Sequence, residues 1–61
     1  MERYVDINGL MEYVSLGRNK ALELGEKSGA KIKFERRAIY NLRVIDEYIE
    51  DLRQEQAKER R

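Results

Sequence analysis

The sequence predicts a small α+β domain containing a short strand, two helices, a β-hairpin and a last helix, in that order. Three observations support this prediction. Two short amphipathic helical patterns meet at a glycine-containing turn, an alternating apolar and basic run follows, and a long helical stripe comes last. The 61 residues suffice for one domain with a limited core, because a chain of this size buries only about 60% of its unfolded surface.

The first strand and helix are predicted from residues 3–14. Arg3-Tyr4-Val5 is a short β-favouring run, and Asp6 is a suitable N-cap for the helix that follows it. The helix is predicted from about Ile7 to Val14, because apolar residues recur there at helical spacing. Gly9 inside this helix costs roughly 1 kcal/mol relative to alanine, so a close approach of another segment would explain it.

A second helix is predicted directly after a tight turn. Gly17 can cap its start, and Ser28-Gly29 supplies a stop just after Lys27. Ala21 and Gly25 share a face of this helix that can pack closely on another element. Two short helices joined by a very tight turn that contains glycine form the helix-turn-helix pattern.

A basic β-hairpin is predicted next. Residues 30–34 alternate apolar and basic side chains, and residues 37–40 form a second β-favouring run. A two-residue turn of Glu35-Arg36 is one alternative, but it lacks the asparagine and glycine residues that favour such turns. We therefore prefer a three-residue turn over residues 35–37. That register places one set of apolar side chains on a single face: Ile32, Phe34, Ala38 and Tyr40.

The last helix follows Asn41, which is a suitable N-cap. Its apolar stripe consists of Leu42, Ile45, Ile49 and Leu52. No large apolar residue follows Leu52, so residues 1–52 are predicted to form the domain. Residues 53–61 are then a charged helical extension or a frayed tail, which is open to contact with DNA, a recombinase or a second copy.

Composition excludes several classes of function. The chain has no cysteine and no histidine, which argues against a disulfide framework, a zinc site and nucleophilic or histidine-based catalysis. The acidic residues of the last helix are those of a solvated face, with favourable pairs such as Arg43 with Glu47. We therefore expect no enzyme, catalytic residue, metal or cofactor. No membrane span or signal-peptide core is present, so we expect a cytoplasmic protein.

The basic residues are concentrated in the middle of the chain, where residues 15–40 carry a net charge of +4. We expect the second helix to read bases in the major groove of DNA through Arg18, Asn19, Lys20, Glu23 and Lys27. We expect the hairpin to contact phosphates through Lys31, Lys33, Arg36 and Arg37. The alternatives are a solvated face on a structural helix, and edge-strand lysines that prevent aggregation.

The whole pattern resembles the excisionase-type family of small winged helix-turn-helix proteins, which are related to the DNA-binding domains of the mercury-resistance-regulator superfamily. The matching segments lie within residues 3–52, and they are Tyr4-Val5-Asp6-Ile7, Ser15-Leu16-Gly17-Arg18-Asn19-Lys20-Ala21, Lys31-Ile32-Lys33-Phe34-Glu35-Arg36-Arg37 and Leu42-Arg43-Val44-Ile45-Asp46-Glu47-Tyr48-Ile49. Two positions depart from the family pattern. Gly9 stands where the family commonly has glutamate, and Glu35 stands where the wing commonly has glycine.

The resemblance implies sequence-specific binding of double-stranded DNA, with the hairpin acting as a wing on the backbone or in the minor groove. It also implies a bacterial or phage-encoded, nucleoid-associated protein that assists a site-specific recombinase (an integrase) in excision. A transcriptional regulator of a mobile element and a protein-interaction module without DNA binding remain the alternatives. One domain of this size would bind weakly alone, so we expect several copies to bind adjacent sites cooperatively.

Overall fold

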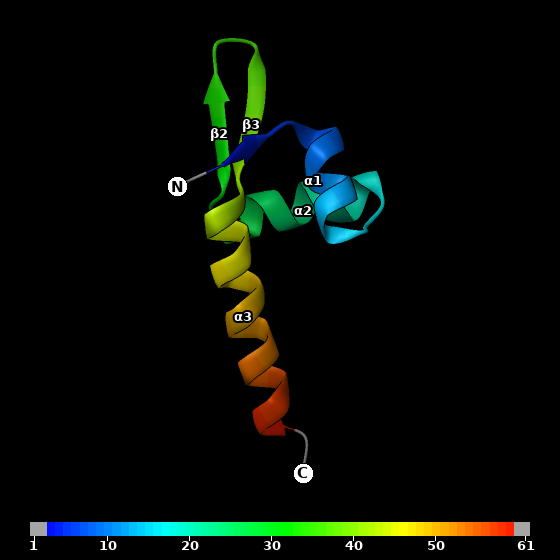
Figure 1. Ribbon diagram of the computed structural model, residues 1–61, viewed down its shortest axis with the longest axis vertical. Helices are drawn as coiled ribbons and strands as arrows, with labels where there is room; N and C mark the ends of the chain where they lie inside the picture. Colours follow the sequence, from blue (N-terminus) through cyan, green and yellow to red (C-terminus); the bar gives the residue numbers. More distant parts are fainter. Residues whose placement is uncertain (1–2, 60–61) are drawn as a thin grey trace.

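A computed structural model describes residues 3–59, with the side chain of Glu59 left aside, and confirms the small α+β fold (Figure 1). The elements follow the chain as β1 (Tyr4–Val5), α1 (Ile7–Val14), α2 (Arg18–Ser28), β2 (Lys31–Phe34), β3 (Arg37–Asn41) and α3 (Leu42–Glu59). The arrangement is that of a winged helix. Figure 1 shows the β2–β3 hairpin and α3 projecting in opposite directions from the centre of the molecule, where α1 and α2 pack. Within residues 3–59, no helix is both long enough and apolar enough to cross a membrane.

Local capping explains the bounds of α1. The Asp6 side chain accepts a hydrogen bond from the backbone N–H of Gly9 at 2.9 Å, which satisfies one of the free donors of the first turn. The helix ends at Ser15, which adopts the left-handed conformation with φ of 59°. Gly9 is explained by a close contact, because a Cβ built there would lie 2.7 Å from the Cβ of Val5. The predicted bounds of this helix are therefore confirmed.

The helix α2 also lies where the sequence predicts it, with one residue more at its end. Gly17 caps its start in an extended conformation without any side-chain hydrogen bond. Gly29 ends it in the left-handed conformation with φ of 79°, which glycine adopts without strain. The turn between α1 and α2 therefore consists of only Ser15, Leu16 and Gly17.

The three strands form an antiparallel sheet in the order β1-β3-β2. In the hairpin, Phe34 pairs with Arg37 and Ile32 pairs with Ile39, so the turn has two residues, Glu35 and Arg36. The preferred three-residue turn is therefore wrong. Glu35 adopts a φ of 57° to make the shorter turn, a conformation that non-glycine residues rarely adopt.

This change of register moves side chains to different faces, because a slip of one residue reverses the face of a whole strand. Tyr40 and Ala38 are paired with Lys31 and Lys33, and this face packs toward the core. Ile32 and Phe34 lie on the outer face with Arg37 and Ile39. The prediction that Ile32 and Phe34 share a face with Ala38 and Tyr40 is corrected accordingly.

The core is small and lies where α1, α2, α3 and the sheet meet. Its buried apolar residues are Leu10, Ala21, Ala30, Tyr40, Leu42 and Ile45. Tyr40 is the largest fully buried side chain, and its ring lies directly on Gly25 of α2. A Cβ built at Gly25 would lie 2.3 Å from a carbon of this ring, so the close approach depends on glycine. The small inner face predicted for α2 is confirmed, because Ala21 and Gly25 are both buried.

The helix α3 begins at Leu42, directly after Asn41, whose side-chain oxygen accepts a hydrogen bond from the N–H of Arg43 at 2.9 Å. Tyr13 ties α1 to α3 by donating its hydroxyl to Asp46 at 2.7 Å, and this bond raises the pKa of Tyr13. Only the first part of the apolar stripe is buried. Ile49 and Leu52 are 39% and 36% exposed, because α3 extends past the other elements (Figure 1).

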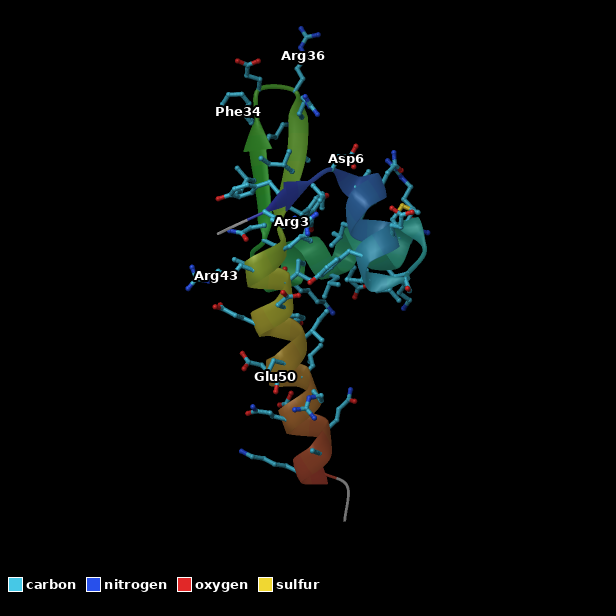
Figure 2. All side chains as sticks on the ribbon, in the orientation of Figure 1. Arg3, Asp6, Phe34, Arg36, Arg43 and Glu50 are labelled. Atoms are coloured by element: carbon cyan, nitrogen blue, oxygen red, sulfur yellow. The ribbon has the colours of Figure 1, made fainter. Side chains whose placement is uncertain are left out.

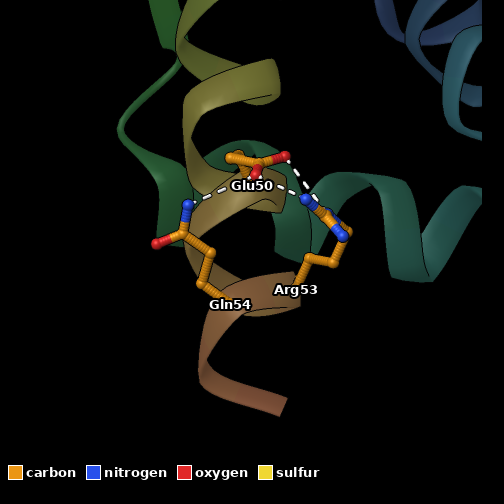
Figure 3. A network of polar contacts seen from close by, with 3 residues as sticks. All are labelled: Glu50, Arg53 and Gln54. Carbon is orange, nitrogen blue, oxygen red and sulfur yellow. Dashed lines mark hydrogen bonds and ion pairs between the residues drawn. The ribbon is translucent and has the colours of Figure 1, made fainter. Parts of the chain in front are cut away.

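Residues 53–59 continue α3 as the predicted extension, whereas residues 60–61 lie outside the described residues. Figure 3 shows the polar contacts that Arg53 and Gln54 make with Glu50 of the same helix. The Glu50 carboxylate accepts hydrogen bonds from Arg53 at 3.0 Å and from Gln54 at 3.3 Å. The Arg53 contact is the main reason that the pKa of Glu50 lies below its ordinary value. The first two residues of the extension, Arg53 and Gln54, thus pair with the preceding turn of the same helix.

Candidate nucleic-acid interface

The first turn of α2 is exposed and carries positive charge. The side chains of Arg18, Asn19 and Lys20 are exposed, and within the described part of the chain none of them makes a hydrogen bond or an ion pair. The turn contains no acidic residue, and Gly17 offers no side-chain cap. Cations at the positive end of a helix dipole are unfavourable, so this turn favours an anion from outside the chain.

The acidic residues of α2 are paired with lysines. Glu23 forms an ion pair with Lys27 at 2.9 Å, and Glu26 forms one with Lys31 of β2 at 3.5 Å. The hydrogen bond from Lys27 is the main reason that the pKa of Glu23 lies below its ordinary value, and the same bond raises the pKa of Lys27. These pairs reduce the negative field that the two carboxylates would present to a polyanion.

A groove of about 200 Å³ lies between α2 and α3, and only some of the predicted base-reading residues line it. Its lining consists of Leu16, Lys20, Glu23, Leu24, Lys27, Tyr48 and Leu52. Lys20, Glu23 and Lys27 therefore lie toward the side of α2 that faces α3, whereas Arg18 and Asn19 do not line the groove. Arg18 and Asn19 are consequently the members of this set that are best separated from the rest of the protein.

The wing presents its basic residues at the far end of the hairpin. Lys33, Arg36 and Arg37 are exposed, and their side chains have no hydrogen-bond or ion-pair partner among the residues that the structure describes. Arg36 lies at the apex of the hairpin and points away from the body of the domain (Figure 2). Lys31 differs from these residues because it lies at the base of the hairpin and is engaged with Glu26.

The unpaired cations of residues 15–40 are thus found in two places, the start of α2 and the end of the wing. They are Arg18, Lys20, Lys33, Arg36 and Arg37, against a single acidic residue without a partner, Glu35. In α3, by contrast, the basic residues Arg43 and Arg53 are paired with Glu47 and Glu50. This distribution favours a polyanion as the ligand of α2 and the wing.

Phe34 is a residue of the wing that the sequence-based set omitted. The sequence predicts that it shares a face with Ala38 and Tyr40, yet it lies on the other face and is 63% exposed, more than any other large apolar side chain in residues 3–59. Only the register of the hairpin reveals this exposure, because the alternation of β2 is compatible with either face pointing outward. No sequence signal distinguished the two faces.

Other kinds of site receive no support from the described residues. Within residues 3–59, no group of three or more acidic side chains is arranged to hold a metal ion. One further hollow is an open surface depression beside α1, whose lining includes Asn8, Glu12 and Ser15.

Comparison with known proteins gives one match, to a family of unknown function, DUF6462, over residues 2–52. The match ends where the apolar stripe of α3 ends, and it spans the helix-turn-helix and the wing. No curated protein and no solved structure matches the chain.

Proposed function

We propose that this protein, which belongs to the DUF6462 family, is a sequence-specific binder of double-stranded DNA. The observation that supports the proposal most strongly is the set of unpaired cations at the start of α2 and on the wing. Backbone phosphates supply most of the affinity in protein–DNA complexes, and such cations are the groups that contact them. The winged-helix arrangement presents these two segments at separate places on one small domain.

In this proposal α2 enters the major groove and its first turn reads bases. Asn19 can form a bidentate pair with adenine, and Arg18 or Lys20 can pair with guanine. Glu23 can accept a hydrogen bond from cytosine, but it must first exchange its ion pair with Lys27. The wing contacts the backbone or the minor groove through Lys33, Arg36 and Arg37, and the paired Lys31 plays a smaller part.

The resemblance to excisionase-type proteins supports a more specific task. We propose that the protein acts in the cytoplasm, on the nucleoid, and assists a site-specific integrase in excising a mobile element. Several copies would bind adjacent sites cooperatively, because a single small domain makes few phosphate contacts. Regulation of transcription from the same element is the alternative that uses the same DNA-binding surface.

A protein-interaction module that binds no DNA is the second candidate function. The exposed apolar residues Ile49 and Leu52 of α3 favour it, because they form part of a stripe that the domain itself leaves uncovered. This candidate predicts that activity depends on α3 and not on the wing.

The salt dependence of DNA binding tests the proposal directly. We expect the full chain to bind duplexes selected from a random library, with log K falling linearly against log salt at a slope of about −2.7 to −4.5. This range corresponds to roughly three to five phosphate contacts at about −0.9 each. Fluorescence anisotropy across a salt series measures the slope. Absent binding, or affinity that does not change with salt, would contradict the proposed function.

Replacing Asn19 by alanine is expected to relax the sequence preference at one position of the site. The lost bidentate contact should reduce discrimination at that base pair by about 1–3 kcal/mol, while binding to unrelated duplexes remains unchanged. Lys33→Ala is the matched control, since a lost phosphate contact weakens binding to all sequences alike. Competition binding against single-base variants of the selected site measures both effects. A uniform loss with Asn19→Ala would assign this residue to the backbone instead.

A further inference from the structure

The end of the wing combines an exposed aromatic side chain with unpaired cations. The two-residue turn makes Phe34 and Arg37 the last cross-strand pair before the apex. Phe34 is 63% exposed, while Ile32, two residues earlier on the same face of β2, is 41% exposed. Figure 2 shows the ring of Phe34 beside the end of the hairpin, next to the apex that carries Arg36.

Folding of the domain does not explain this aromatic residue. The core consists of residues at the base of the hairpin and in the helices, and Phe34 is neither part of it nor packed against it. An exposed apolar ring of this size is unfavourable in water, so a polar residue would serve the free protein better. The ring is therefore available for contact with another molecule.

The charges around Phe34 indicate which kind of molecule that is. Lys33 precedes it in the chain, Arg37 lies opposite, and Arg36 occupies the apex, with Glu35 as the only acidic residue at this end of the hairpin. A partner must therefore offer negative charge around an apolar slot. The minor groove of DNA has this composition, since phosphates line its edges and its base steps can open to admit apolar side chains.

We propose that Phe34 is a wedge that enters the minor groove beside Arg36 and partly unstacks one base step, bending the DNA at the wing. This inference rests on the proposed DNA-binding function and goes beyond it. Unstacking costs least at flexible pyrimidine–purine steps such as TA and CA. The wing therefore adds a sequence preference at a position where no side chain needs to hydrogen-bond to a base.

The test uses the full chain and duplexes recovered from a random library, with donor and acceptor dyes at the two ends and 2-aminopurine at steps under the wing. We expect the wild type to shorten the end-to-end distance and to raise 2-aminopurine fluorescence at one step. Phe34→Ala should bind about tenfold more weakly and lose both signals, because stacking on an aromatic ring is removed. Ile32→Ala is the matched control. It removes an exposed apolar residue from the same face, and it should keep both signals.

Several outcomes would overturn the wedge. If the DNA stays straight and stacked in the wild-type complex, the wedge proposal is wrong. Salt-dependent binding in the same assay would then still support the proposed DNA-binding function. Absence of binding by the wild type would reject both proposals. If Phe34→Ala and Ile32→Ala together lost cooperative binding of several copies while bending persisted, the outer face of the wing would be a protein–protein surface instead. Circular dichroism confirms that each variant is folded, and Phe34→Leu, which retains an apolar wedge, should recover part of the bend if the proposal is correct.

Discussion

Replacing Gly25 by alanine is expected to destabilise the domain by about 2 kcal/mol, although alanine favours helices by about 1 kcal/mol over glycine. The added Cβ would lie 2.3 Å from a ring carbon of Tyr40, and this ring is fully buried. A rigid ring in the core has no room to withdraw, so α2 itself must move away from the sheet. For a domain of this size the melting temperature should fall by about 8–16 °C.

Thermal and urea unfolding of the full chain measure this effect, with Gly17→Ala as the control. Gly17 caps the start of α2, and a Cβ built there has no neighbour within 4 Å. A double-mutant cycle with Tyr40→Leu isolates the contact, because the cost of Gly25→Ala should shrink when the ring is absent. A Gly25→Ala variant as stable as the wild type would mean that the packing of α2 on Tyr40 is looser than the structure shows.

Reversing the charge of the wing, with Arg36→Glu and Arg37→Glu together, is expected to lower DNA affinity by about 100-fold or more. Two cations that are proposed to bind phosphates become anions beside Glu35, so the slope of log K against log salt should fall in magnitude by about 2. Neither arginine side chain makes a hydrogen bond or an ion pair within residues 3–59, so the fold should be unaffected. The matched control is Arg53→Glu with Lys58→Glu, which changes the net charge equally on the extension of α3.

The two double variants separate the candidate functions. Equal losses of affinity in both would show a general effect of net charge and would remove the wing from the interface. The milder pair Arg36→Ala with Arg37→Ala guards against disturbance of the turn and should still lose about tenfold in affinity. If biological activity survives charge reversal of the wing but disappears when the chain is truncated after Leu52, the protein-interaction module is the correct function.

The helices of the domain could be predicted closely from the sequence because their ends are fixed by nearby residues. Asp6, Gly17, Gly29 and Asn41 each act within a few residues along the chain, through caps or left-handed backbone conformations. Such signals need no knowledge of the tertiary fold. The predicted winged arrangement followed from the order of these elements, and the structure confirms it.

The hairpin register could not be predicted, because the residues of its turn are uninformative. Glu35-Arg36 contains neither glycine nor asparagine, and the structure forms a two-residue turn with Glu35 at a φ of 57°. Packing of Tyr40 against Gly25 fixes which face of β3 points inward, but that face is the same for either turn length. The two-residue turn decides which residues of β2 lie opposite Tyr40, and it places Phe34 on the outer face. The exposure of Phe34, and with it the proposed wedge, follows from the length of this turn.

The residues of the candidate site could be predicted, but which of them are paired with acidic residues and which are unpaired could not. The sequence showed where the basic residues gather, whereas the ion pairs of Lys27 and Lys31 depend on how α2 and β2 are placed. Likewise, the periodicity of α3 shows an apolar stripe without revealing which part is covered. Ile45 is fully buried, and Ile49, one turn later, is exposed because no other element reaches it.

The pairing of β1 with β3 affects the order in which a newly made chain can fold. Tyr4 pairs with Asn41, and the N–H of Leu42 donates to the carbonyl of Arg3 at 2.9 Å, so β1 has no partner until most of the chain has left the ribosome. The helix-turn-helix and the hairpin close over short loops, whereas β1 must close a loop that spans both of them. We therefore expect the strand that is synthesised first to be the last to join the sheet.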